Sequence, residues 1–440
     1  MNRTAVLLVA FASLAAAQGT LQLSLKRAVE IALTPEGSAR VALAEQSIKQ
    51  GEDRVRQARS TFLPTLDGSL QERNQTVNLR AFGLTFPALP FGLSIPSFAG
   101  PFTVFDARAS VQQSVFNFGD IRKYQAARSA LVATHSDAET TRNQVSEQVS
   151  RAYMQCLRAG AALESAQANV DLSGALERLA NSQKNAGTGT GIEVTRAQVQ
   201  LANDRQRLIV ADNDRRRAVL ELLRAMGISL DTQVEFSDKL SYAPVNVSEL
   251  EASLKTARQD RTELKAQQQR EQTAKLNYGS VASERLPSVA AFGDYGAIGL
   301  QADNARPTRE YGITLKVPLF DGFRRDARRE ESYSQYRQET IRTRDLIQQI
   351  ELEVRLALDS LRSAAAQVET ARDGLMLAQN ELAQAQRRYQ AGVTNSIEVT
   401  DAQTRLIRAE DNQIAALYSH NVARIDLAAA TGTIREFVNP

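Results

Sequence analysis

The 440-residue chain carries 53 lysines and arginines against 50 aspartates and glutamates, so its formal charge of +3 is nearly balanced. This balance argues against nucleic acid as a partner, because binding to a polyanion depends on a surplus of cations. The single cysteine, Cys156, excludes disulfide bonds within the chain, and His135 and His420 provide no histidine and cysteine ligand set for a metal. The sequence also has no nucleophile, acid–base pair or metal cluster set in a cleft-forming fold, so we predict no catalytic, metal or cofactor-binding residues and no enzyme activity.

The first residues have the pattern of a secretory signal peptide. After Arg3, the stretch TAVLLVAFASLAAAQ combines an apolar run with the small triplet Ala15-Ala16-Ala17. We place the signal at 1–17, with cleavage near Gln18. A transmembrane anchor is the alternative, but an anchor needs roughly 20 apolar residues. We therefore expect an exported chain.

Two segments alternate between apolar and polar side chains, which predicts strands with one face in an apolar medium. The segment 104–116, VFDARASVQQSVF, does so, and 310–319 does so more cleanly. Each has a weaker partner upstream, so we expect β-hairpins at about 62–116 and 285–320. A soluble four-stranded sheet capping a helical bundle is the alternative reading. About ten residues per strand suits a bilayer, but four strands are fewer than the roughly eight that close a barrel.

The segments that follow the strands are long and helical. No proline interrupts Ile121–Asn185 or Arg324–Gln390, and at about 1.5 Å per residue the first could reach roughly 95 Å. Small and apolar residues recur at heptad spacing along both, which is the mark of helices packed nearly parallel. Cys156 lies on this seam, which favours a core position. Each helix then turns and returns as a second helix that ends near Gly227 or Gly432.

The two turns share a motif. NAGTGTGIEVTRAQ at 185–198 reappears as QAGVTNSIEVTDAQ at 390–403, with the Ile-Glu-Val-Thr displaced by 397 − 192 = 205 residues. A phosphate-binding loop is excluded, because no lysine follows and the second copy loses two glycines. Further identities at this displacement indicate a duplication, with repeats at 18–227 and 228–440 and turns at about 185–192 and 390–397.

The whole chain after the signal resembles the TolC-type outer-membrane efflux protein family. The opening 23–66, beginning LSLKRAVEIAL, is similar to the family's first helices and the Leu-Pro entry to its first strand. VPLFDGFRR at 317–325 matches its strand-to-helix junction, echoed by SVFNFGDIR at 114–122. The two Ile-Glu-Val-Thr copies occupy its periplasmic helical tips.

The resemblance implies a mainly α fold with a β-barrel portion. Long antiparallel helical hairpins would form an α-helical barrel in the periplasm, and four transmembrane strands per chain would give a homotrimer a twelve-stranded barrel in outer-membrane lipid. The resemblance further implies a passive exit duct of a tripartite efflux pump or a type I secretion system. Its partners would be a periplasmic adaptor and an inner-membrane transporter. The segment 228–250 would belong to an equatorial belt.

The resemblance also assigns residues to the periplasmic aperture. Glu398 and Asp401 match the family's constricting acidic pair, and Glu193 matches the acidic position of the other hairpin. Tyr389 matches an aromatic position that helps to hold the closed mouth. The turns are expected to contact the adaptor through Gly187, Thr188, Gly189, Gly392, Val393 and Thr394.

Three further features of the sequence bear on these assignments. Thr394 stands where the family has a basic residue that links neighbouring helices, and Arg196 is a hypothetical substitute. Glu193 and Glu398 have an alternative role, since an acidic residue also stabilises a helix start. The segment 77–102, rich in proline and phenylalanine, has no counterpart in the second repeat and is expected to be an external loop.

Two rival functions are weaker. A structural coiled-coil protein of the envelope, such as a spacer or adhesin, would need the heptads. It would have no reason for paired amphipathic strands or for a duplicated helical hairpin. An exported enzyme would need reactive groups that the sequence does not offer.

Overall fold

The computed structural model describes residues 21–34, 36–83, 97–244 and 249–438. The predicted signal peptide at 1–17 lies outside these residues. The chain divides into two compact units, a sheet unit from 47–136 and 265–345, and a hairpin unit from the remaining segments.

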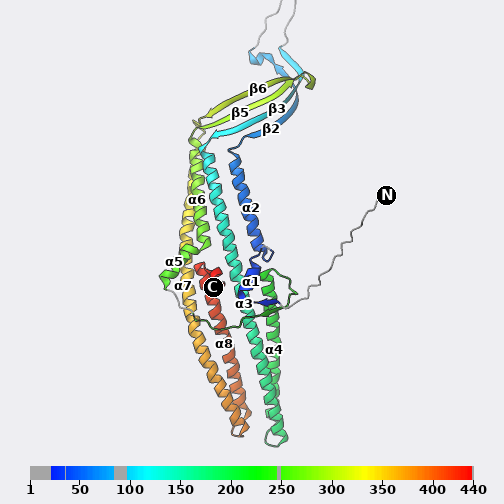
Figure 1. The fold of residues 1–440 in the computed structure, drawn as a ribbon, viewed down its shortest axis with the longest axis vertical. Coiled ribbons are helices and arrows are strands. Elements are labelled where there is room, and N and C mark those ends of the chain that lie inside the picture. Colours follow the sequence, from blue (N-terminus) through cyan, green and yellow to red (C-terminus); the bar gives the residue numbers. More distant parts are fainter. Residues whose placement is uncertain (1–20, 35, 84–96, 245–248, 439–440) are drawn as a thin grey trace, which may run out of the picture. The chain divides into compact units, whose positions relative to one another are not determined.

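The sheet unit is built on four antiparallel strands in the order β2-β3-β5-β6 (Figure 1). The four predicted strands are therefore confirmed, and β3 pairs with β5 to join the strands of the two repeats. The strands are β2 (Thr65–Asn78), β3 (Phe98–Phe116), β5 (Ser288–Gly299) and β6 (Arg306–Lys316). Short 3-10 turns accompany them: η1 (Leu79–Phe82), η2 (Ser283–Arg285) and η3 (Ala302–Asn304).

The sheet has two chemically different faces. Register places Ser110 beside Asp67 and Asp294, with Arg108 on the same face at 2.9 Å from Asp294 and 3.0 Å from Asp106. The opposite face carries exposed apolar side chains, among them Leu66, Tyr295, Tyr311, Ile313 and Leu315. This separation is what the period-two pattern predicts.

The strand ends differ from the sequence prediction. Pairing continues as far as Asn78 with Phe98, so both ends of the segment expected to be an external loop belong to strands. Residues 84–96 of that segment lie outside the described residues. At the other end of the sheet, β6 stops at Lys316, before Pro318, which has no N–H to donate to a ladder.

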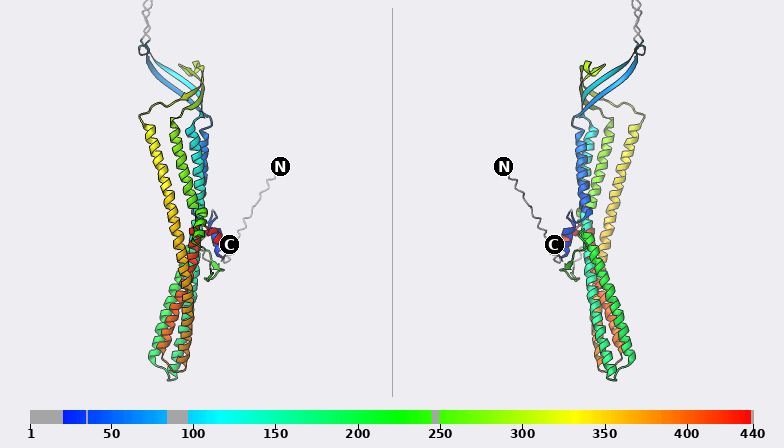
Figure 2. Two further views of the ribbon diagram at one scale, coloured as in Figure 1. Left: turned by 90° about the vertical axis from the view of Figure 1, so that its left-hand side faces the viewer. Right: turned by 90° about the vertical axis from the view of Figure 1, so that its right-hand side faces the viewer.

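The two predicted helical hairpins are confirmed. They are formed by α3 (Phe118–Asn185) with α4 (Gly191–Met226), and α7 (Arg324–Gln390) with α8 (Ser396–Thr431). Residues 118–136 of α3 and 324–345 of α7 belong to the sheet unit, and the rest of both hairpins belongs to the hairpin unit. Both turns lie at the same end of the unit, and the turned views in Figure 2 keep them together. In the described ranges, no helix combines the length and apolar character needed to cross a membrane.

Short elements surround the other end of this unit. Strand β1 (Leu21–Leu23) pairs in parallel with β4 (Val234–Phe236), and the hydroxyl of buried Tyr153 on α3 lies 2.9 Å from the Leu23 carbonyl oxygen and 2.7 Å from Asp238 Oδ2. This hydroxyl thereby ties two segments distant in sequence to α3. The remaining helices of this unit are α1 (Leu25–Ala32), α5 (Leu250–Asp260) and α9 (Ile434–Val438). Most residues of α2 (Ala39–Ser60) and α6 (Thr262–Ala282) belong to the sheet unit.

Cys156 belongs to the core of the hairpin unit, packed with Val149, Leu157 and Leu222. Burial raises the pKa of its thiol to about 12. Since the thiolate is the reactive form, this raised pKa keeps the thiol largely unreactive near neutral pH. We expect a maleimide to leave Cys156 unmodified in the native protein and to label it after unfolding, as read by intact-protein mass. Labelling of the native protein at the rate of a free thiol would place the side chain outside the core.

Candidate functional site

The first turn joins α3 to α4 and uses glycine where the backbone requires it. Gly187 has φ +73°, and the N–H groups of Gly187 and Thr188 bond back to the carbonyl oxygens of Lys184 and Gln183. Such bonds satisfy the carbonyl groups that a helix end leaves without partners. Glycine at 187 thus closes α3 and lets the chain reverse.

Glu193 stabilises the start of α4. Its Oε2 accepts hydrogen bonds from the Thr190 backbone N–H at 2.9 Å and from the Thr190 hydroxyl at 3.0 Å. Here, an acidic residue satisfies a free N–H at the positive end of a helix. Glu193 therefore has the alternative role that the sequence allowed, which is to stabilise a helix start.

The second turn joins α7 to α8 with the same geometry. Gly392 has φ +72°, and its N–H bonds to the Tyr389 carbonyl oxygen at 3.1 Å. The side chain of Asn395 caps α8 by accepting from the Ile397 N–H at 3.0 Å. A different residue type thus caps each hairpin, although the turns share one backbone path.

Glu398 is held within its own hairpin. One carboxylate oxygen accepts from the Thr394 hydroxyl, and the other lies 3.2 Å from Arg388 Nη1 on α7. Thr394 therefore contacts Glu398 directly, and Arg388 supplies a cation. Sequence reasoning missed Arg388. Arg388 could have been found from its position, because it lies in the last turn of α7 and a short turn brings that end close to the start of α8.

Asp401 stands three residues after Glu398, so the two carboxylates share one face of α8. Its side chain is exposed, and it forms no ion pair or hydrogen bond with the part of the chain that the structure describes. Of the acidic pair, Glu398 is partly neutralised by Arg388 within the chain and Asp401 carries an open negative charge.

Tyr389 lies between the two hairpins. Its side chain is 5% exposed and packs with Leu382, Val399 and Leu406, while Leu176 of α3 borders the same apolar cluster. Burial and the charge of Glu193 raise the pKa of the phenol. The hydroxyl, which has no hydrogen-bond partner among the described residues, therefore stays protonated and can donate. Tyr389 and Glu193 also line one small cavity, so the structure brings these two predicted residues together.

The repeated Ile-Glu-Val-Thr motif now has a physical explanation. In both copies the isoleucine is exposed, the glutamate bonds beside the helix start, and the valine is buried between helices. In both, the threonine hydroxyl donates to the carbonyl four residues before it. These residues are Ile192, Glu193, Val194 and Thr195 in the first copy, and Ile397, Glu398, Val399 and Thr400 in the second.

The predicted turn residues are mostly exposed. Gly187, Thr188, Gly392 and Val393 are open to solvent, whereas Gly189 and Thr394 are partly buried. With Val393, the exposed Ile192 and Ile397 add apolar surface around the turns. Sequence reasoning did not single out these two isoleucines, although the motif contained them.

Comparison with known proteins gives consistent matches. A model of the outer membrane efflux protein family matches residues 33–228 and 253–433. The chain is 24% identical over 398 residues to pyoverdine export outer membrane protein OpmQ of Pseudomonas aeruginosa, covering 89% of this chain and 83% of OpmQ. It is 23% identical over 295 residues to outer membrane protein TolC of Vibrio cholerae, covering 66% and 67%. The solved structure of VceC from Vibrio cholerae has a TM-score of 0.78 at 19% identity, covering 93% and 96%. Two matched segments agree with the internal duplication.

Proposed function

Since the chain belongs to the outer membrane efflux protein family, whose members are outer-membrane exit ducts rather than enzymes, we propose that its working form is a homotrimer. The main support for this proposal is that the sheet of one chain has two open edges. Strands β2 and β6 are its edges, and each leaves one side of its backbone unpaired. A sheet in a bilayer has no open edges, and about eight strands are the minimum for closure. Three copies would supply 3 × 4 = 12 strands.

The trimer would place the apolar face of the sheet, with Tyr311 and Ile313, against lipid and the polar face around Arg108 toward the lumen. The helical hairpins would extend into the periplasm as the wall of a duct. Such a duct conducts passively, and the energy for transport comes from its partners. We expect purified protein to give stepwise, ohmic currents in planar bilayers without any nucleotide. A preparation that inserts and never conducts would refute the duct.

The turns of the hairpins would form its periplasmic aperture. Around a threefold axis, Glu398 and Asp401 would contribute three copies each, and a ring of carboxylates attracts cations and sets selectivity. Glu193 and Tyr389 would control its width. Tyr389 lines the same cavity as Glu193 of the other hairpin, which supports a joint role for the two residues where the hairpins meet.

The same turns would dock the periplasmic adaptor of a tripartite pump, whose inner-membrane transporter would load the duct. Exposed Val393, Ile192 and Ile397 support this role, because apolar surface on a protruding tip suits a protein contact. Exposure of the glycine backbone at Gly187 and Gly392 allows close approach by a partner.

Replacing Val393 with aspartate should therefore weaken adaptor binding by about tenfold, since one charge placed in an apolar contact typically removes a contact worth more than 1 kcal/mol. Co-purified adaptor can be quantified by mass spectrometry after crosslinking in cells. Leu377→Asp is the matched control, because Leu377 is also apolar and 64% exposed, against 70% for Val393, but lies away from the turns. Equal adaptor recovery from the two variants would move the docking surface elsewhere.

A further inference from the structure

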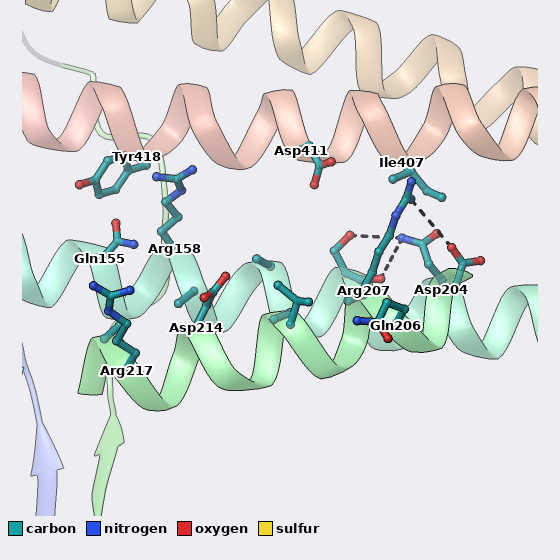
Figure 3. Close-up of a pocket in the computed structure, with 18 of the residues that line it drawn as sticks. Gln155, Arg158, Asp204, Gln206, Arg207, Asp214, Arg217, Ile407, Asp411 and Tyr418 are labelled. Carbon is teal, nitrogen blue, oxygen red and sulfur yellow. Dashed lines mark hydrogen bonds and ion pairs between the residues drawn. The ribbon is translucent and has the colours of Figure 1, made fainter. Parts of the chain in front are cut away.

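One carboxylate in the described part of the hairpin unit is buried, and its ion pair there is a long one. Asp204 on α4 is 1% exposed, and its nearest cation, Arg207 Nη1, lies 3.9 Å from Oδ1. Figure 3 shows Arg207 and Asp204 joined by a dashed line that marks this ion pair, at one end of a groove of about 810 Å³ between α3, α4 and α8. Gln200 Nε2 donates to both carboxylate oxygens at 3.1 Å. A buried charge needs such donors, because burial removes its water.

The remaining donor comes from the other hairpin. Gln403 on α8 is 0% exposed, and its Nε2 donates to Asp204 Oδ2 at 3.2 Å. A hydrogen bond to an ionised acceptor is stronger than one between neutral groups, and burial protects it from competition by water. Asp204 and Gln403 thus form a charge-assisted link between the hairpins.

The surroundings of this link favour separation as well as closure. Gln403 Oε1, Tyr389 Oη and Ser396 Oγ are buried and have no hydrogen-bond partner among the described residues. Their three side chains line the small cavity that Glu193 also lines. Polar groups buried without partners oppose the closed packing, and water satisfies them once the helices part. The apolar cluster around Val399 and the Asp204–Gln403 bond oppose that separation.

This link occurs once per chain. Shifting by 205 residues places Gln198 opposite Gln403 but Ala409 opposite Asp204, so Asp204 has no acidic counterpart in the other repeat. Gln198 is exposed on α4, whereas Gln403 is buried. The duplication therefore does not explain the pair, and the amide at 403 has acquired a contact that the equivalent amide at 198 lacks.

We propose that the Asp204–Gln403 contact is a clasp that holds the two hairpins together in the narrow state of the aperture, with the charge of Asp204 as its main strength. The proposal rests on the proposed role of the turns as the aperture and adds a determinant of its opening. Gln403 lies within the apolar cluster, between Ala402 and Leu406 on α8, and its side chain is buried, whereas that of Asp401 is exposed. The clasp therefore acts on the separation of the hairpins rather than on the charge of the ring.

The test places a second carboxylate against the first. In Gln403→Glu, two buried carboxylates face each other, and we expect the open-state occupancy of the full-length channel in planar bilayers to rise about tenfold, the factor that loss of one charge-assisted hydrogen bond gives. The double variant Asp204→Asn with Gln403→Glu restores an amide–carboxylate bond with the roles exchanged. We expect its occupancy to return to that of the wild type.

The matched control is Gln198→Glu, the same substitution at the exposed equivalent position, which should leave occupancy unchanged. If Gln403→Glu yields too little folded channel, Asp204→Asn is recorded instead. This variant preserves the shape of the side chain and removes only its charge. We expect it to raise occupancy about threefold. Unchanged occupancy in the variant recorded would overturn the clasp. If Glu398 and Asp401 still govern cation block in that case, only the clasp is refuted and the proposed aperture is retained. If they do not, the proposed aperture is refuted as well.

Discussion

Replacing Glu398 and Asp401 together with alanine should weaken the block of single-channel current by multivalent cations by about tenfold or more. In a trimer this change removes three copies of each carboxylate from one narrow ring. It also leaves Arg388, now 3.2 Å from Glu398, without its partner in every chain. The ring would change from an attractive site for cations to a repulsive one. Titration of a trivalent cation against single-channel current in planar bilayers measures the effect.

The control removes the same two charges elsewhere. Glu369→Ala with Asp373→Ala eliminates two exposed carboxylates on α7, away from the turns. This variant should retain the wild-type block, because exposed charges more than a Debye length of about 8 Å from the site are screened at physiological salt. Should both double variants be blocked alike, the constriction lies outside the acidic pair.

Gly227→Ala should destabilise the fold severely. Gly227 ends α4 with φ +71°, and an added Cβ would lie 1.3 Å from the Gly37 carbonyl oxygen. No rotamer change relieves this clash, because both atoms belong to the backbone or are fixed to it. The left-handed conformation alone costs roughly 1–2 kcal/mol for alanine, and forced backbone shifts add about 1–3 kcal/mol. We expect a large fall in the apparent midpoint of thermal unfolding and in the yield of folded protein.

Gly187→Ala separates the cost of the left-handed conformation from the cost of the backbone clash. Gly187 has nearly the same angle, φ +73°, but nothing lies within 4 Å of the position of an added Cβ. This variant should show only the conformational cost, roughly 1–2 kcal/mol. Similar midpoints for the two variants would mean that the close approach of Gly37 to Gly227 does not exist in the folded protein.

The fold was predictable because its signals are local and repeated. The alternation of apolar and polar side chains identified the strand that contains Ile313 and Leu315. The heptad spacing of small and apolar residues identified the helices before each turn. Strand ends were less predictable, since they depend on a partner. The pairing of Asn78 with Phe98 extends β2 and β3 into a segment whose proline and phenylalanine content suggested a loop.

The positions of the two turns were predictable from the sequence, but the contacts around them were not. The repeated motif marked the turns, and resemblance marked Glu398 and Asp401. Local spacing does not reveal which atoms meet across helices, so the pairing of Glu398 with Arg388 was missed. The contact between Asp204 and Gln403 joins residues 199 apart, and Gln403 matches Gln198 in the repeat although only Gln403 is buried. Burial of this kind is a property of the folded interface.

The central claim is that one chain forms only a third of the channel wall. Native mass spectrometry of the protein purified from outer membranes in mild detergent tests this most directly. We predict one dominant species with the mass of three chains. A species with the mass of a single chain, stable after the detergent is removed, would contradict the account.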